Sequence, residues 1–329
     1  MRPDASQLGG TRELFVVGSP RSGTTLVAGL LDLLPGVWIG KETGFIPRLF
    51  EPGMESLHGW DTPRLEKTVA RVNASLQSQA WMSLATVAGA RQFWSETGSP
   101  GYEGLIRYVW SLEVPSGRPR PAVVGDQSPE YVLAIPLLEQ LFPRALYLHV
   151  VRDPRDVVSS VLPLHFGAHS AAIAALYWNE SVAGWWAAER RVPASRRFEV
   201  RYEDLVAEPV AVFKAMAGFL GITPRGPIER QELSGDAHGL ARQWPHHARL
   251  AEPIDDRSVG RHRRDLSDRD RALVEAICYT GLVTYGYEAG PFRPSPVLEE
   301  KALLLTGERL RDVCGRALGA ARRLWRSRA

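Results

Sequence analysis

Short apolar runs that alternate with helical patterns are the feature that most constrains the fold of this chain. Each run is followed by a turn or by the start of a helix, which is typical of strands joined by helical crossovers. Such strands form a parallel sheet with helices on both faces, so the sequence predicts an α/β fold with three layers. The expected strands are Leu14–Val17, Val37–Ile39, Ala122–Val124, Ala145–Val151 and Phe198–Tyr202.

A long segment between the second and third expected strands, residues 50–119, shows no strand signal of its own. It has a helix start at Thr62-Pro63 and is rich in tryptophan. We expect a helical cap insertion over the carboxyl edge of the sheet, where ligands of open α/β folds bind. Packing in the core of the cap is the preferred interpretation of each of its tryptophans, Trp60, Trp81, Trp94 and Trp110.

The first expected strand runs into a glycine loop, G18-S-P-R-S-G-T-T25. Its two glycines let successive backbone N–H groups converge on an anion at the start of the following helix. The loop matches the phosphate loop of nucleotide hydrolases, G-x-x-x-x-G-K-[ST], except that Thr24 replaces the lysine. The missing lysine argues against cleavage of a β–γ phosphate bond, because that lysine and Mg²⁺ normally neutralise the transferring group.

A second candidate anion site lies in V151-R-D-P-R-D-V-V-S-S160, at the end of the fourth expected strand. A helix is predicted to begin at Asp153-Pro154, and Ser160 follows Arg152 by about two helical turns, so both side chains can face one crevice. Alternatively, the two arginines and two aspartates of this motif pair among themselves at the helix start. The motif alone leaves both interpretations open.

Together the two motifs resemble those of sulfotransferases that use 3′-phosphoadenosine 5′-phosphosulfate (PAPS). Residues 20–25 are similar to the 5′-phosphosulfate loop of that family, and residues 151–160 to its 3′-phosphate motif. The resemblance implies a P-loop-like nucleotide site, PAPS as co-substrate and no metal. The nucleotide-binding residues that it implies in these motifs are Ser19, Arg21, Ser22, Gly23, Thr24, Thr25, Arg152 and Ser160.

Three further segments resemble the same family. G40-K-E-T-G-F-I-P-R48 is similar to a segment of the tyrosylprotein sulfotransferases, which implies that Glu42 is the general base for the acceptor hydroxyl. V200-R-Y-E-D-L205 is similar to a family element whose tyrosine lies beside the nucleotide, here Tyr202. S258-V-G-R-H-R-R264 is similar to a basic loop over the 3′-phosphate and implies Arg261 or Arg264 as the contact.

The chain departs from the family pattern in the segment Asp126-Gln127-Ser128-Pro129. A lysine that steadies the oxygen bridging phosphate and sulfate often stands where this chain has Gln127. An amide donates hydrogen bonds but carries no charge. We therefore expect Lys41 or Arg21 to support the leaving group, beside Gln127 and the base Glu42.

These patterns predict transfer of a sulfuryl group from PAPS to a hydroxyl of a small molecule, glycan or glycolipid. The alternatives are a small-molecule kinase with a degraded phosphate loop and a catalytically silent nucleotide-binding protein. Histidines and carboxylates show no metal-ligand spacing, so no metal is expected.

Composition adds expectations about location and partners. The two cysteines, Cys278 and Cys314, are far apart, and there is no signal-peptide core or apolar run of about 20 residues. A cytoplasmic protein is expected. Residues 301–329 hold eight basic and two acidic residues, so the rest of the chain is slightly acidic and no nucleic-acid partner is expected. We expect a sulfotransferase domain over 1–295 and a basic amphipathic helix within 296–329, docked on its own domain or touching a membrane or partner.

Overall fold

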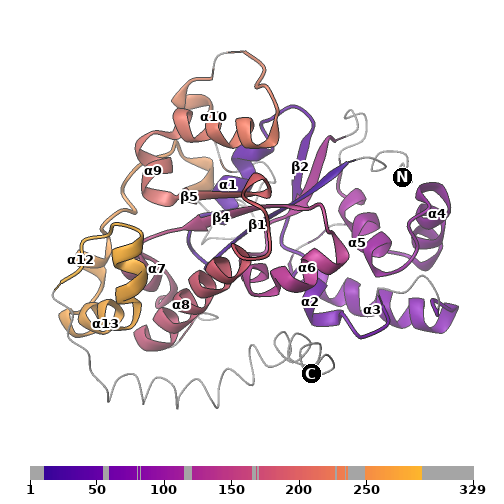
Figure 1. Ribbon diagram of the computed structural model, residues 1–329, viewed down its shortest axis with the longest axis horizontal. Helices are drawn as coiled ribbons and strands as arrows, with labels where there is room; N and C mark the ends of the chain where they lie inside the picture. Colours follow the sequence, from indigo (N-terminus) through magenta and orange to yellow (C-terminus); the bar gives the residue numbers. More distant parts are fainter. Residues whose placement is uncertain are drawn as a thin grey trace.

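The computed structural model describes residues 11–54, 59–79, 81, 83–114, 121–164, 168, 170–226, 228–233, 235 and 249–290. Its centre is a five-stranded parallel sheet in the order β2-β3-β1-β4-β5 (Figure 1). The strands are β1 (Arg12–Gly18), β2 (Val37–Gly40), β3 (Val123–Asp126), β4 (Leu146–Val151) and β5 (Arg197–Arg201). Each overlaps one expected strand, with ends that differ by at most two residues, which confirms the predicted parallel sheet.

Helices cover both faces of this sheet, because side chains of a strand point alternately to opposite faces. On β1, Leu14 and Val16 pack with one group of helices, whereas Phe15 and Val17 pack with another. The first group comprises α1 (Thr24–Leu31), α9 (Tyr202–Ala207) and α10 (Pro209–Leu220). The second comprises η2 (Pro129–Ala134), α6 (Ile135–Leu141) and the end of α8 (Ala171–Ala188). The predicted three-layer α/β fold is confirmed.

A third apolar cluster fixes the helix that follows β4. It joins α7 (Pro154–Val161) to α8 and to α13 (Asp268–Thr284), which follows the short α12 (His262–Asp265). At its centre Trp178 donates from Nε1 to the carbonyl oxygen of Arg152 at 2.9 Å. This bond anchors the backbone where β4 ends. The remaining short elements are η3 (Ala194–Arg196) and η4 (Arg230–Glu232).

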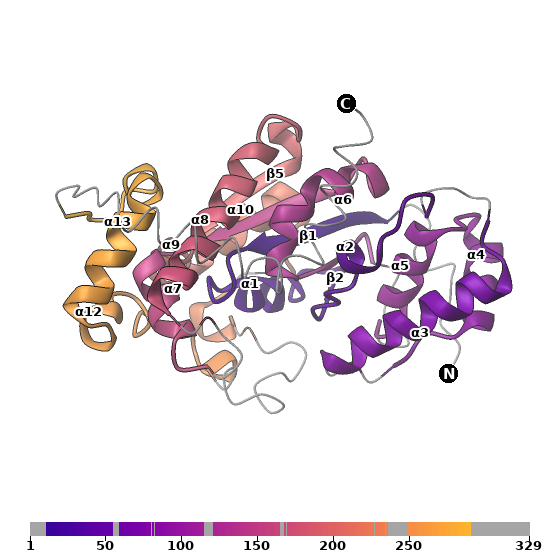
Figure 2. The same ribbon diagram turned by 90° about the horizontal axis from the view of Figure 1, so that it is seen from below.

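The described part of the segment between β2 and β3 is helical, as predicted. It contains α2 (Ile46–Leu49), α3 (Thr62–Ser78), α4 (Val87–Thr97) and α5 (Tyr102–Ser111). Helices α3, α4 and α5 form a group at one side of the sheet (Figure 2). They do not cover its carboxyl edge in the way that the sequence predicts. The four tryptophans of the cap are buried. The rings of Trp60 and Trp94 meet edge to face at 5.6 Å in the core of the cap, whereas Trp110 packs against Phe15 of β1, with the ring centroids 5.8 Å apart.

Among the described helices, none has both the length and the apolar content that crossing a bilayer requires. The basic helix expected within residues 296–329 lies outside the described residues.

Candidate active site

The carboxyl ends of all five strands meet around one cavity of about 830 Å³. The residues that follow them line this cavity: Arg21 after β1, Glu42 after β2, Gln127 after β3, Arg152 after β4 and Tyr202 after β5. Parallel strands end at the same edge of a sheet, so short motifs far apart in the chain come together there. The two phosphate motifs therefore open onto the same cavity.

Most of the predicted site residues line this cavity, and three do not. Ser19 and Ser22, which belong to the glycine loop, are buried, and the side chain of Arg264 is 78% exposed and pairs with Asp265. Of the two late arginines, Arg261 is the one that faces the cavity. The predicted residues in the lining are Arg21, Gly23, Thr24, Thr25, Lys41, Glu42, Gln127, Arg152, Ser160, Tyr202 and Arg261.

The glycine loop is shaped by two positive φ angles. Arg21 has φ 69°, which is uncommon for a residue with a side chain and marks a strained position in the loop. Gly23, just before α1, has φ 102°. A Cβ at Gly23 would lie 2.7 Å from Cδ2 of Tyr202, so the loop packs against that ring.

Gly23→Ala should therefore remove nucleotide binding, because both the φ angle and the clash with Tyr202 oppose the native loop. Gly98 is a matched control: it has φ 65°, and a methyl group added there would meet nothing within 4 Å. Gly98→Ala should lower the free energy of unfolding by about 1 kcal/mol and leave nucleotide binding intact. Thermal unfolding with and without 3′-phosphoadenosine 5′-phosphate (PAP) measures both. Full PAP stabilisation of Gly23→Ala would contradict this view of the loop.

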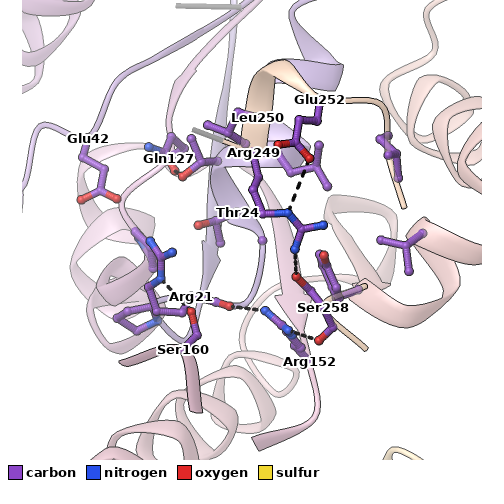
Figure 3. Close-up of a pocket in the computed structure, with 18 of the residues that line it drawn as sticks. Arg21, Thr24, Glu42, Gln127, Arg152, Ser160, Arg249, Leu250, Glu252 and Ser258 are labelled. Carbon is purple, nitrogen blue, oxygen red and sulfur yellow. Dashed lines mark hydrogen bonds and ion pairs between the residues drawn. The ribbon is translucent and has the colours of Figure 1, made fainter. Parts of the chain in front are cut away.

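Arg152 and Arg21 are linked to each other across the floor of the cavity. Arg152 donates from Nη1 to the carbonyl oxygen of Arg21 at 3.2 Å and from Nη2 to that of Ser258, and its guanidinium lies 4.4 Å from the Tyr202 ring centroid. Arg21 in turn donates from Nε to Ser160 Oγ at 3.3 Å. Figure 3 shows these bonds.

The interpretation in which the charges of the second motif pair only among themselves holds for Arg155 but not for Arg152. Arg155 pairs with Asp153 at 2.7 Å and with Glu275 at 2.7 Å. Arg152 instead turns toward the glycine loop, as the anion-clamp interpretation requires. Arg152 of this motif therefore lines the cavity, whereas Arg155 forms ion pairs away from it.

Asp156 holds the late basic loop against the cavity. Its carboxylate accepts from the backbone N–H of Gly260 at 2.7 Å and of His262 at 2.9 Å, and it lies 2.7 Å from His262 Nδ1. Burial opposes the charge, but these hydrogen bonds keep the pKa of Asp156 below its usual value. The loop between Ser258 and His262 is fixed in this way, and Arg261 with it.

The cavity is electrostatically suited to an anion. Burial, and then the charges of Arg152 and Arg261, lower the pKa of the Arg21 guanidinium, whereas Glu42 opposes this shift. A bound polyanion would relieve the repulsion among these arginines. Arg249 adds a further cation to the lining and pairs with Asp255. Sequence reasoning missed Arg249, because no motif surrounds it.

Glu42 lies at the opposite side of the cavity from Arg152, Ser258 and Arg249 (Figure 3). Burial, and then the negative charges of Glu130 and Asp126, raise the pKa of Glu42 to about 8, and Arg21 partly offsets this rise. A carboxyl group with this pKa exchanges protons near neutral pH, which suits acid–base catalysis.

This pKa predicts a pH dependence. Glu42 is neutral below its raised pKa and ionised above it, so a base at this position is inactive at low pH. For the sulfuryl transfer expected from the sequence, with Glu42 as base, kcat/KM for PAPS should rise about tenfold per pH unit below pH 8 and level off above it. Initial rates from pH 5.5 to 9.5 measure this. A flat profile through pH 8 would contradict the assignment.

Lys41 and Arg21, the two cations that the sequence suggests for the leaving group, differ in their surroundings. Lys41 Nζ lies 3.8 Å from Glu113, and both side chains are largely buried. Gln127 accepts from Thr25 Oγ1 through its Oε1 at 3.4 Å, which ties it to the glycine loop. The charge of Lys41 is therefore partly neutralised by Glu113. Arg21 instead donates a hydrogen bond to Ser160 and interacts electrostatically with Glu42.

Among the described residues, no three histidine, cysteine or carboxylate side chains are grouped so that they could hold a metal ion.

Comparison with known proteins agrees with the site. The profile of the sulfotransferase family matches residues 13–225, so the chain belongs to the sulfotransferase family. Among its relatives is protein-tyrosine sulfotransferase 2 of Gallus gallus, 26% identical over 69% of this chain and 56% of that protein. Another is protein-tyrosine sulfotransferase A of Caenorhabditis elegans, 26% identical over 64% and 50%. The chain spans about half the length of these curated relatives.

Solved structures of similar fold are also sulfotransferase domains. The sulfotransferase domain of the Synechococcus PCC 7002 olefin synthase has a TM-score of 0.56 and 23% identity, covering 88% of this chain and 99% of that one. The sulfotransferase domain of the curacin biosynthetic pathway has a TM-score of 0.51 and 19% identity, covering 85% and 99%. At these identities the likeness shows the fold, which is that of the family.

Proposed function

We propose that this protein transfers a sulfuryl group from PAPS to a hydroxyl of a small molecule, glycan or glycolipid, with Glu42 as general base. One observation carries the proposal: Arg21, Arg152 and Glu42 line the same cavity. Arg21 and Arg152 can hold the 5′ and 3′ phosphates of one nucleotide, and Glu42, on the side of the cavity away from Arg152, can reach an acceptor hydroxyl beyond the 5′ end.

The residues present fit such a nucleotide. Arg152 Nε is buried without a hydrogen-bond partner, although the rest of its guanidinium is held in place. A volume of about 830 Å³ lies within the range of sites for a nucleotide with a small acceptor. Thr24 and Thr25 add hydroxyl groups at the amino end of α1, where the helix dipole favours negative charge.

In the proposed reaction, Glu42 accepts the proton of the acceptor hydroxyl while the acceptor oxygen attacks sulfur. The bond between sulfur and the bridging oxygen breaks, and that oxygen keeps the electron pair. Arg21, Thr24 and Thr25 hold the departing 3′,5′-bisphosphate, and the sulfate ester carries the transferred group. The arginines supply the positive charge that a metal supplies in phosphoryl transfer.

The acceptor class is supported by the side of the cavity near Glu42. Ser78 and Gln79, from the end of α3, line the cavity together with Gln127. Such uncharged groups donate and accept hydrogen bonds, which suits a polyhydroxylated acceptor. The curated relatives are protein-tyrosine sulfotransferases by name, so tyrosine peptides belong among the acceptors tested.

Nucleotide binding is tested by thermal unfolding. PAP at about 100 times its Kd should raise the Tm on the order of 5 °C, equally with and without EDTA. Arg152→Gln should lose this response. Arg257→Gln, whose side chain is 65% exposed and outside the cavity lining, should keep it. A response to ATP that requires Mg²⁺, without a response to PAP, would favour a small-molecule kinase.

Transfer is tested with ³⁵S-labelled PAPS and a panel of sugars, phenols, glycolipids and tyrosine peptides, with products identified by mass spectrometry. A labelled ester of a sugar, phenol or glycolipid supports the proposal. Label on tyrosine peptides alone would overturn the proposed acceptor class. PAP binding without transfer to any acceptor or to water would indicate a silent nucleotide-binding protein.

A further inference from the structure

A buried carboxylate at the end of β3 organises the segment that carries Glu42. Asp126 is fully buried, and its Oδ2 accepts from Thr43 Oγ1 at 2.5 Å and from Trp110 Nε1 at 3.4 Å. Its Oδ1 accepts from Ser128 Oγ at 2.6 Å. Thr43 directly follows Glu42 in the chain, so one of these bonds acts next to the proposed base.

The proton directions in this cluster follow from the chemistry of its groups. Burial raises the pKa of Asp126 to about 6, so this carboxylate is ionised above pH 7 and only accepts hydrogen bonds. Thr43 therefore donates its single hydroxyl proton to Asp126. The bond of 2.9 Å between Thr43 Oγ1 and Tyr131 OH must then be donated by Tyr131. Tyr131 OH accepts from the backbone N–H of Ile46 at 3.0 Å. A one-way chain therefore runs from Ile46 through Tyr131 and Thr43 to Asp126.

A second, shorter chain ends on the other carboxylate oxygen. The backbone N–H of Gly44 donates to Ser128 Oγ at 3.3 Å, and Ser128 donates to Asp126 Oδ1. Both chains start on backbone N–H groups within the four residues that follow Glu42. Asp126 therefore fixes this turn from two directions.

The cap holds the same turn through its carbonyl oxygens. Trp81 Nε1 donates to the carbonyl oxygen of Glu42 at 3.0 Å, and Ser75 Oγ donates to that of Thr43 at 2.9 Å. Arg48 donates to the carbonyl oxygen of Gly44 and, at 2.8 Å, to Ser75 Oγ. The turn that carries Glu42 is thus clamped between the end of β3 and helix α3.

We propose that Thr43, Tyr131 and Asp126 are positioning residues for the reaction, because their hydroxyl chain sets the orientation of the Glu42 backbone toward the cavity. The proposal rests on the proposed role of Glu42 as base. A connected buried network holds one geometry when every member is satisfied and loosens when one member is removed. Misplacing a reacting group by about 1 Å costs on the order of 100-fold in rate.

The test compares Thr43→Val with Thr43→Ser. Valine keeps the shape of threonine and removes its hydroxyl, whereas serine keeps the hydroxyl. Thr43→Val should lower kcat by about 10–100-fold, with Kd for PAP unchanged within about twofold. Thr43→Ser should stay within about threefold of the wild type. The rate is measured as ³⁵S transfer from PAPS to the best acceptor of the panel and as hydrolysis of PAPS by water.

A second readout does not depend on activity. Thr43→Val should speed amide hydrogen exchange at Gly44 and Ile46 by about tenfold or more, because both N–H groups donate into the network that Thr43 joins to Asp126. Tyr131→Phe breaks the same chain at the next link and should reproduce both effects. A purely structural role would lower Tm and PAP affinity together and leave no specific loss of kcat.

Glu42→Gln is measured in parallel, so that the two proposals fail separately. If Glu42→Gln keeps wild-type turnover, Glu42 is not the base, and the proposed function fails in that part. If Glu42→Gln loses turnover while Thr43→Val and Tyr131→Phe keep full kcat, the positioning proposal alone is overturned. Unchanged amide exchange at Gly44 and Ile46 in both variants would overturn it as well.

Discussion

Glu42→Gln should lower kcat by about 10²–10⁴-fold while PAP binds as tightly as to the wild type. The amide is nearly isosteric with the carboxyl group but cannot accept the acceptor proton. Binding should persist because the proposed cationic contacts for phosphate, Arg21 and Arg152, follow other strands, β1 and β4. Single-turnover sulfate transfer at pH 9, where Glu42 is ionised in the wild type, gives the largest contrast.

The matched control is Glu130→Gln, since Glu130 is an exposed carboxylate that lines the same cavity. Its charge helps to raise the pKa of Glu42. Removing it should shift the rising limb of kcat/KM to lower pH and leave the plateau at high pH nearly unchanged. If Glu130→Gln abolished turnover while Glu42→Gln did not, the base would have to be reassigned to Glu130.

The parts of this site that can be predicted from sequence are those with local signals. The strand that ends at Gly18 and the one that ends at Val151 each run into a motif whose residue types bind anions. Parallel strands end at one edge, so the topology alone brings Arg21 and Arg152 together. The sequence places the end of β3 too early, at Val124, because Gly125 and Asp126 are residue types that are depleted in strands, although Asp126 is fully buried.

The parts that cannot be predicted depend on contacts between distant segments. Asp126 organises the hydrogen bonds of this cluster only because Thr43, 83 positions away, and Trp110 donate to its carboxylate. Arg249 enters the cavity from a segment without a motif. The absence of a strand signal and the helix start at Thr62-Pro63 predict that the cap is helical, but its place beside the sheet depends on which apolar surfaces pair, and periodicity does not encode that.

Gln127 carries no charge, so in the proposed reaction Arg21 or Lys41 must supply the positive charge that stabilises the leaving group. In the proposed reaction, negative charge develops on the oxygen that leaves with the 5′-phosphate, and a fixed cation nearby stabilises the transition state more than the ground state. Arg21 donates to Ser160 of the 3′-phosphate motif and lies within the field of Glu42, so it spans the two ends of the site. Lys41 has Glu113 at 3.8 Å as a counter-charge.

We therefore expect Arg21→Ala to lower kcat by about 10²–10³-fold and also to weaken PAP binding, because one side chain serves both the leaving group and the bound phosphate. Arg21→Lys keeps the charge but loses the planar guanidinium, so its kcat should lie between those of the wild type and Arg21→Ala. Lys41→Met should change kcat by less than about tenfold, since the charge removed is already shared with Glu113. Pre-steady-state transfer rates and PAP titrations of the three variants separate the two roles. A larger loss of kcat in Lys41→Met than in Arg21→Ala would assign the leaving group to Lys41, with the ion pair to Glu113 breaking when the nucleotide binds.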